Sequence, residues 1–168
     1  EKSYAIGTIV VHPQNENLVY AACMGKIWGA NKERGLYRSK DGGKTWENIL
    51  FVNDSTGCVD VKMDPTNPLI MYASMWQSRR TPYSLESGGR GDGLYKSMDG
   101  GDTWKKISEN PGMPTGLDGK IIVSISPTNG DLLFALVENK ANDGLYRSDD
   151  GGKHWSLTST NNDLRQRP

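Results

Sequence analysis

The chain has 168 residues, and its 20 Lys plus Arg balance its 20 Asp plus Glu, so the formal net charge at pH 7 is zero. This length is ordinarily enough for one domain with a real core. A neutral chain gives no reason to expect a nucleic acid or an anionic membrane as the main partner. No apolar run approaches the roughly 20 residues that cross a bilayer, so we expect no membrane insertion. A signal peptide is not recognisable, and any export signal is expected outside this chain.

The residue types favour an all-β protein. There are 20 glycines, and Trp and Tyr together number twelve against two Phe, a combination typical of many turns and half-buried aromatic strands. Cys23 and Cys58 do not make a disulfide framework, and no C-x-x-C motif indicates zinc. We expect two small buried residues, and whether they are bonded stays open.

The first unit, residues 4–52, is predicted to hold four short strands at 6–11, 18–24, 35–39 and 45–50. Its first half reads IGTIVVHPQNENLVYAA. Ile9 and Val11 fall on one face by two-residue alternation. Pro13 fixes φ just past the first strand, where no ladder N–H is needed. The second half is the segment GLYRSKDGGKTW, which supplies a strand, a hairpin loop and the start of the last strand.

Two further units repeat this pattern. Residues 53–110 are predicted to form strands at 58–63, 69–76, 93–97 and 103–108, and residues 117–160 to form strands at 120–125, 132–137, 144–148 and 154–158. The twelve-residue segment recurs as GLYKSMDGGDTW and GLYRSDDGGKHW, 58 and then 51 residues further on. A period near 50 residues built from four strands is typical of β-propeller blades. We therefore predict three four-stranded antiparallel sheets.

The recurring segment is interpreted as a structural clasp. Its Asp can accept backbone N–H bonds across the turn, its glycines permit positive φ, its Ser can bond across the hairpin, and its Trp covers the hairpin. These positions are Ser39, Asp41, Gly43 and Trp46; Ser97, Asp99, Gly101 and Trp104; and Ser148, Asp150, Gly152 and Trp155. Chemistry rarely needs one acid at three symmetric positions, and one carboxylate per loop is too few for an EF-hand type calcium site. Asp149 adds a second carboxylate only in the third copy, so we expect no metal and no cofactor.

The segment resembles the Asp box, S-x-D-x-G-x-T-W, which is shared by sialidases, xyloglucanase-type glycoside hydrolases and the luminal domain of sortilin. The longer stretches GKIWGANKERGLYRSKDGGKTWENIL and DSTGCVDVKMDPTNPLIMYASMWQSRRTPYSLESGG resemble large bacterial sortilin-like, Asp-box (BNR) repeat proteins. The resemblance covers residues 4–158, with His154 in place of the usual Thr. It implies a propeller, a longer parent chain, and an extracellular, periplasmic or cell-surface location in a bacterium.

Three blades are too few for a closed propeller, because propellers close with about 4–8 blades. Two open flanks would leave apolar surface exposed. We therefore expect residues 1–168 to be part of a larger propeller of six to eight blades. The expected structural partners are the remaining blades or a second copy of the chain.

In such a blade the first strand lines the central channel, and the loops between second and third strands lie on the rim opposite the Asp boxes. These loops, at 25–34, 77–92 and 138–143, differ greatly in length, and long distinctive loops on a rigid scaffold commonly bind ligands. The candidate ligand-binding residues are Trp28, Trp76, Arg79, Arg80 and Tyr83, a set that suits a sugar, an acidic glycan or a peptide. The alternative is that Trp28 and Trp76 pack loops onto the tops of the blades, and that the arginines pair with Glu86, Asp92 or acidic residues of the neighbouring blade.

Asp60 is the one weak catalytic candidate, because it lies on a channel-lining strand where the other units carry Thr8 and Ile122. Glycosidases need two carboxyl groups, about 5 Å or about 6.5–9.5 Å apart. Glu86 or Asp118 would have to partner Asp60, which could also meet Arg79 or Arg80. The alternative for Asp60 is a structural ion pair.

Three functions follow. The leading hypothesis is an exported binding scaffold that holds a glycan or a protein on the loop-bearing face. The second is a part of a glycoside hydrolase acting on polysaccharide, with catalytic carboxylates partly or wholly outside the chain. The third is a purely architectural role.

Overall fold

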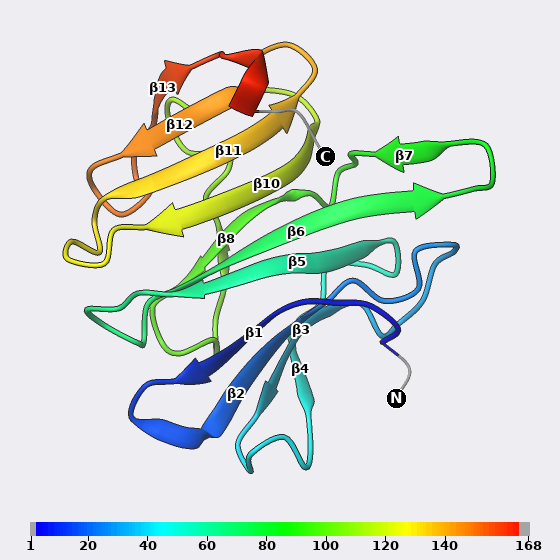
Figure 1. The fold of residues 1–168 in the computed structure, drawn as a ribbon, viewed down its shortest axis with the longest axis vertical. Helices are drawn as coiled ribbons and strands as arrows, with labels where there is room; N and C mark the ends of the chain where they lie inside the picture. The colour runs from blue at the N-terminus through cyan, green and yellow to red at the C-terminus, as the bar shows by residue number, and fades with distance from the viewer. Residues whose placement is uncertain (1–2, 165–168) are drawn as a thin grey trace.

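The computed structural model describes residues 3–164 and shows three antiparallel sheets side by side (Figure 1). The first sheet has the order β1 (Ile6–His12), β2 (Asn15–Cys23), β3 (Gly35–Ser39), β4 (Glu47–Leu50). The second runs β5 (Thr56–Met63), β6 (Met71–Arg80), β8 (Gly93–Ser97), β9 (Lys105–Lys106), with β7 (Leu85–Ser87) paired to the outer half of β6. The third runs β10 (Asp118–Ile125), β11 (Leu133–Asn139), β12 (Gly144–Ser148), β13 (Ser156–Ser159). A short 3₁₀ helix, Asn162–Leu164, follows β13.

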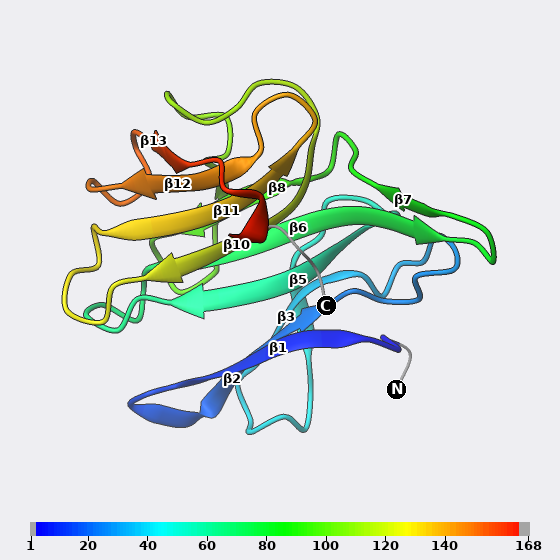
Figure 2. The same ribbon diagram turned by 45° about the horizontal axis from the view of Figure 1, so that its top comes forward.

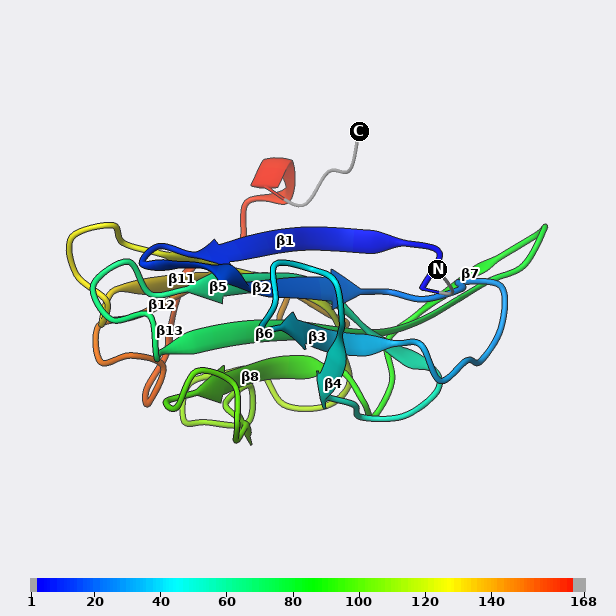
Figure 3. The same cartoon turned by 90° about the horizontal axis from the view of Figure 1, so that it is seen from below.

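The predicted all-β architecture of three four-stranded antiparallel units is confirmed, and we refer to the units as blades 1, 2 and 3 in chain order. Figure 2 shows the three sheets following one another in that order, and Figure 3 shows blade 1 from β1 at its inner edge to β4 at its outer edge. Among the described residues, no helix has the length and apolar character needed to cross a bilayer.

Some predicted strand limits were wrong. Strand β2 begins at Asn15 rather than 18, and the strand expected at 103–108 is reduced to Lys105–Lys106. The largest difference lies at 77–92, which was predicted to be a loop. There β6 continues to Arg80 and turns back into β7, because Thr81 N donates to Ser84 O at 2.8 Å and closes a tight turn. The resulting hairpin projects beyond the sheets in Figure 1.

Each Asp box is held by the same short-range hydrogen bonds. In blade 2, Ser97 Oγ accepts from Gly101 N at 2.8 Å and donates to Asp99 Oδ1 at 2.8 Å. Asp99 in turn accepts from the backbone N–H of Thr103 at 2.9 Å and from its hydroxyl. Gly100 and Gly101 have φ of 72° and 94°, a conformation that glycine adopts without steric cost. The hydrogen bonds from Thr103 lower the pKa of Asp99, so they favour the ionised form of its carboxyl group.

The third box departs from the first two at two positions. His154 replaces the threonine, and its Nδ1 lies 2.6 Å from Asp150 Oδ2, where the hydroxyl would be. In the first two boxes the indole N–H of Trp46 or Trp104 donates to a glycine carbonyl at 3.0 Å. The corresponding carbonyl of Gly152 instead accepts from Asn110 Nδ2 at 2.7 Å. The buried indole N–H of Trp155 has no hydrogen-bond partner among residues 3–164.

The hydrophobic cores lie between blades rather than within them. One cluster joins blades 1 and 2, with Leu36 of blade 1 against Val61 and Met71 of blade 2. The second joins blades 2 and 3, with Leu94 of blade 2 against Val123 of blade 3. Blade 2 is therefore buried on both faces, whereas blades 1 and 3 are each covered on one face only.

A polar clasp accompanies each core. The hydroxyl of Tyr20 on β2 donates to the carbonyl of Gly100, in the box of the next blade, at 2.8 Å. Arg38 on β3 donates to the same carbonyl at 3.0 Å. The next interface repeats this arrangement, since Lys96 donates to Gly151 O at 2.8 Å and Tyr72 reaches it at 3.4 Å. The Asp box thus closes its own hairpin and also presents a carbonyl to the preceding blade.

We predict that Ser97→Ala lowers the free energy of unfolding by about 1–3 kcal/mol, because it leaves the buried N–H of Gly101 without an acceptor. Urea unfolding followed by tryptophan fluorescence measures the change. The control Ser124→Ala, at an exposed serine of β10, is expected to stay within about 0.5 kcal/mol of the parent. Equal effects of the two substitutions would contradict the clasp role of the box serine.

Candidate ligand-binding rim

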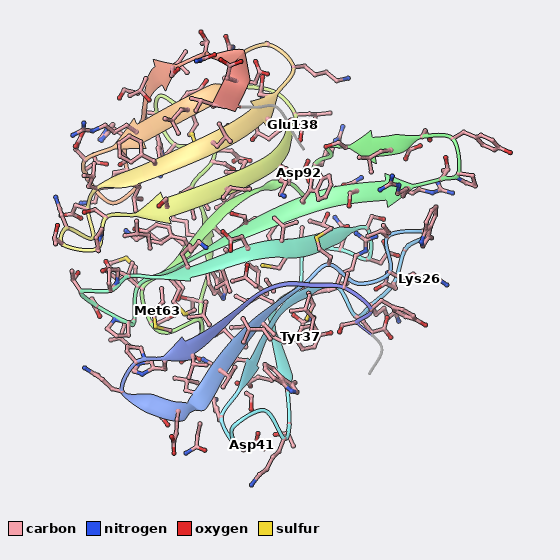
Figure 4. All side chains as sticks on the ribbon, viewed as in Figure 1. Lys26, Tyr37, Asp41, Met63, Asp92 and Glu138 are labelled. Carbon is pink, nitrogen blue, oxygen red and sulfur yellow. The ribbon has the colours of Figure 1, made fainter. Side chains whose placement is uncertain are left out.

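The loops that join second to third strands gather on one rim with the connectors between blades. We call this the loop rim, formed by residues 25–34, 77–92, 109–117 and 138–143. In Figure 4 Lys26, Asp92 and Glu138 lie on the side of the β6–β7 hairpin, whereas Met63 lies at the opposite ends of the strands. Gly88 of the hairpin packs against Asp118 at the start of β10, which brings the second loop and the third blade together.

Loop 25–34 is fixed by a buried arginine. Arg34 is 1% exposed, and its guanidinium donates to Ser55 O at 2.8 Å, to Lys26 O at 3.0 Å and to Ser78 O at 3.2 Å. It therefore joins the loop of blade 1 to the backbone of blade 2. The backbone N–H of Arg80 donates to Ile27 O at 2.9 Å and adds a second link. Trp28 follows directly and is 54% exposed, so its side chain lies on the rim in contact with solvent.

The β6–β7 hairpin carries the other exposed candidates. Arg79 and Arg80 are both exposed, and Tyr83 at the tip is 98% exposed. Successive strand residues point to opposite faces, so the two guanidinium groups leave opposite sides of the hairpin. Arg79 lies across the hairpin from Glu86, but neither arginine forms an ion pair with a described residue.

Trp76 is placed differently from the other candidates. It is half-buried, and its indole N–H donates to Ser87 Oγ at 3.0 Å. Ser87 Oγ donates to the carboxylate of Glu138 at 3.2 Å, and Lys120 Nζ lies 6.0 Å from the centre of a Trp76 ring. These contacts connect the hairpin to blade 3, as the packing alternative expected. A role of Trp76 in ligand binding stays a prediction.

Asp60 lies in an ion pair and away from the arginines. Its Oδ1 accepts from Thr8 Oγ1 of blade 1 at 2.7 Å and lies 3.2 Å from Lys62 Nζ. The side chain is buried between the first strands of blades 1 and 2. This arrangement corresponds to the structural alternative.

Two other carboxyl groups, Asp92 and Asp118, are buried at the loop rim. Asp92 accepts from the backbone N–H groups of Gln77 and Gly89, and burial raises its pKa to about 7. Asp118 accepts from Asn139 Nδ2 at 2.9 Å, and burial raises its pKa as well. Desolvation is the largest cause of the raised pKa of Asp92, and the nearby carboxylate of Asp118 raises it further.

A cavity of about 310 Å³ lies beside Asp118, in the connector between blades 2 and 3. Lys106 and Glu109 form an ion pair of 2.8 Å along its wall. Its remaining lining residues are Ser108, Met113, Pro114, Thr115, Gly116 and Asp118. Among the described residues no group of three or more His, Cys, Asp or Glu is arranged to hold a metal ion.

Known proteins share both the repeat and the sheet arrangement. Residues 36–49 match the BNR-Asp box repeat and residues 146–157 match the BNR/Asp-box repeat. A xyloglucanase of Acetivibrio thermocellus, Xgh74A, is 28% identical over 179 aligned residues, covering 90% of this chain and 19% of the relative. A Paenibacillus xyloglucanase is 29% identical over 118 residues, covering 64% of this chain and 10% of the relative. The chain is part of a BNR/Asp-box β-propeller related to the xyloglucanase type.

Solved structures agree on the fold of this Asp-box propeller. The GH74 xyloglucanase of Xanthomonas campestris superimposes with a TM-score of 0.68 at 22% identity, covering 92% of this chain and 21% of that one. The structure described as YCF48 bound to D1 peptide superimposes with a TM-score of 0.54 at 18% identity, covering 93% of this chain and 41% of that one. The chain thus spans about a tenth to a fifth of the length of the curated relatives that it matches.

Sequence reasoning missed Arg34 and Asp92 as organisers of the rim. Both immediately precede the first glycine of an Asp-box segment, and Asp143 holds the same position in blade 3. A charged residue at this point in every unit was the available signal. The sign of the charge differs because Arg34 faces backbone carbonyls, whereas Asp92 faces backbone N–H groups.

We predict that Arg34→Leu destabilises the Asp-box propeller by about 3 kcal/mol, because several buried carbonyls lose a charged donor. Arg34→Lys is expected to recover only part of this loss, since an ammonium cannot reproduce the guanidinium fork. Urea unfolding gives the stabilities, and limited proteolysis reports the loosening of loop 25–34. The exposed Arg90→Leu serves as the control, and an Arg34→Leu variant as stable as this control would contradict the anchoring role.

We also predict that the carboxyl group of Asp92 makes stability fall as pH rises. Its pKa is raised in the folded state, so the folded protein retains a proton that the unfolded chain releases above about pH 4. Relative to Asp92→Asn, the parent is expected to lose about 2.5 kcal/mol between pH 5 and pH 8, measured by urea unfolding at each pH. Asp163→Asn, at an exposed position, is the matched control. A stability difference between the parent and Asp92→Asn that does not change with pH would show that the carboxylate of Asp92 is ionised throughout this range.

Proposed function

We propose that this chain supplies a polysaccharide-binding surface of an exported Asp-box propeller, and that the loop rim makes the contact. The observation that carries the proposal is Trp28, exposed on a loop that buried Arg34 fixes beside the β6–β7 hairpin. An aromatic ring on a fixed loop offers a large contact area, and the backbone that carries it need not be ordered on binding. Arg79 and Arg80 add planar donors for hydroxyl or carboxylate oxygens on the same rim.

The curated relatives support a polysaccharide over a protein ligand, since they carry the name xyloglucanase. Xyloglucan is therefore the first ligand to test. An extracellular, cell-surface or periplasmic location of the protein is part of the same proposal, because plant and microbial polysaccharides are found outside the cytoplasm. A peptide ligand remains the competing outcome, for which YCF48 bound to D1 peptide is a precedent of similar fold.

A second candidate function, glycoside hydrolysis by the longer protein, is favoured by the same relatives. Hydrolysis requires two carboxyl groups about the scissile bond, at least one of them free to exchange a proton. Asp60 is held by Thr8 and Lys62. Asp92 has a raised pKa, but its side chain is buried and both of its oxygens accept backbone hydrogen bonds, so it does not face a bound sugar. Under this alternative the chain would orient the polysaccharide, and catalytic carboxylates would come at least partly from residues outside it.

We predict that the chain binds soluble xyloglucan and that Trp28→Ala weakens the affinity at least tenfold, which corresponds to about 1.4 kcal/mol. Isothermal titration with xyloglucan oligosaccharides measures the affinity, and release of reducing ends measures hydrolysis. Leu69→Ala, an exposed apolar residue at the other end of the strands, is the control and is expected to bind normally.

The outcomes separate the candidates. Binding without reducing-end release supports the scaffold, and turnover by the chain alone would establish that a complete catalytic pair is present. Binding unaffected by Trp28→Ala would place the ligand away from the loop rim. No binding to any polysaccharide tested, with or without charge, would contradict the proposal and leave the architectural role.

A further inference from the structure

A long connector joins blades 2 and 3 and forms the cavity beside Asp118. The connector runs over residues 107–117, whereas residues 51–55 are enough to join blades 1 and 2. All the residues that line the cavity lie between Lys106 and Asp118, so both of the blades that flank it belong to this chain. Its volume of about 310 Å³ is at the lower end of the range of about 300–1,000 Å³ that is common for small-molecule sites.

Hydrogen bonds hold this connector against blade 3. The carbonyl of Pro111 accepts from the backbone N–H of Trp155 at 2.9 Å, and Asn110 Nδ2 donates to Gly152 O at 2.7 Å. Gly112 has φ of 89° and lies so close to blade 3 that a Cβ atom there would stand 1.7 Å from the carbonyl oxygen of Trp155. The backbone of the connector is therefore fixed, and the cavity is preformed.

Asp118 places a buried carboxyl group without a counter-ion in the wall of this cavity. It is 8% exposed, and its Oδ1 accepts from Asn139 Nδ2 at 2.9 Å. Among residues 3–164 no group donates to its Oδ2, and no cation lies within ion-pair distance. Lys106, on the same wall, is already paired with Glu109 at 2.8 Å. Burial raises the pKa of Asp118, as expected for a carboxyl group whose charge is poorly compensated.

The other lining residues add a hydroxyl group and apolar surface. Ser108 is 2% exposed, and its hydroxyl group has no hydrogen-bond partner within the described part of the chain. Met113 and Pro114 line the cavity with apolar atoms. The cavity therefore combines an uncompensated carboxyl group, an unpaired hydroxyl group and a small apolar patch. Such a lining suits a small ligand that has a positive charge at one end and carbon atoms at the other.

We propose that this cavity binds a small organic cation that carries a primary ammonium group, with the carboxylate of Asp118 as its counter-ion. An ammonium group is a compact point charge, which suits a carboxylate with one free oxygen. A guanidinium group fits less well, because it pairs best with both carboxylate oxygens and Asn139 already holds one of them.

Other kinds of ligand match the lining less well. An anion would face the carboxyl groups of Asp118 and Glu109, with only the already paired Lys106 to compensate. A metal ion would lack ligands, because the described residues include no group of three or more His, Cys, Asp or Glu arranged to hold one. A neutral sugar would leave the charge of Asp118 uncompensated. The proposal does not depend on polysaccharide binding at Trp28, which lies on the loop of blade 1.

Two matched pairs of probes separate charge from shape. Glucosamine and glucose differ by one amino group on the same ring, and diaminobutane and butanediol share one carbon chain. Titration of each probe into the isotope-labelled protein, followed by amide NMR spectra in phosphate buffer, gives its affinity and shows which backbone amides respond. Tris is avoided because it is itself a primary amine. We expect each amine to bind at least tenfold more tightly than its matched alcohol and to shift amides within residues 106–118.

Variants test the role of the carboxylate and the place of binding. Asp118→Asn removes the charge but keeps an oxygen that can accept from Asn139, and it should weaken the binding of both amines at least tenfold. Thr115→Trp, at an exposed lining residue, should fill the cavity and weaken binding to a similar extent. Asp163→Asn, at an exposed position outside the cavity, is the control and should bind like the parent.

Circular dichroism melts check that each variant is folded, and Thr115→Trp carries the test if Asp118→Asn is not. Several results would overturn the proposal. The first is an alcohol that binds as tightly as its matched amine, which would make the cavity a site for neutral polyols. The second is that neither amine shifts an amide within residues 106–118. The third is a folded Asp118→Asn or Thr115→Trp variant that binds the amines as tightly as Asp163→Asn does.

Discussion

The structure depends on the hydrogen bonds inside the Asp-box hairpin. A buried serine hydroxyl and an aspartate carboxylate hold two consecutive glycines at positive φ, and this conformation turns the first glycine carbonyl toward the preceding blade. Tyr20 and Arg38 converge on that carbonyl at one interface, and Tyr72 and Lys96 at the other. One local motif therefore sets both the geometry of a hairpin and the registration of neighbouring sheets. Such coupling explains why the motif recurs without change of length while the loops around it vary.

The two ends of the strands carry different kinds of residues. The boxes and the turns after the first strands carry the repeated fold-holding contacts, and the loop rim carries the differences between blades. At the loop rim, the residue immediately before the Asp-box segment is a buried hydrogen-bond donor in blade 1 and a buried hydrogen-bond acceptor in blade 2. Arg34 gathers carbonyls from three segments, and Asp92 gathers backbone N–H groups around the base of the β6–β7 hairpin. Both fix the loops from inside, which leaves Trp28 and Tyr83 free to face solvent. The backbone that carries these exposed side chains is therefore fixed by buried polar contacts.

Burial between blades rather than within them also defines how the chain relates to longer relatives. A blade has almost no core of its own, because its two faces belong to two different interfaces. The middle blade is satisfied on both sides, whereas the outer blades each carry one face of the same composition exposed to water. Since the relatives are several times longer than this chain, the same two faces are where neighbouring blades would stand in a longer protein.

The sequence alone determined the repeat, the four strands of each blade, the all-β class and the hairpin role of the boxes, because these rest on short-range patterns of alternation, turn residues and spacing. It also placed Trp28, Arg79, Arg80 and Tyr83 on a variable rim. The tertiary structure decided the contacts and the burial of side chains, which depend on residues distant in the chain. It turned residues 77–92 into a hairpin, drew Trp76 toward blade 3 and joined Asp60 to Thr8 and Lys62. It buried Arg34 and Asp92, which one-dimensional patterns present as ordinary polar loop residues. The physical reason is that burial and partner choice are properties of the packed sheets, and a side chain's partners across a blade interface leave no mark in its own local sequence.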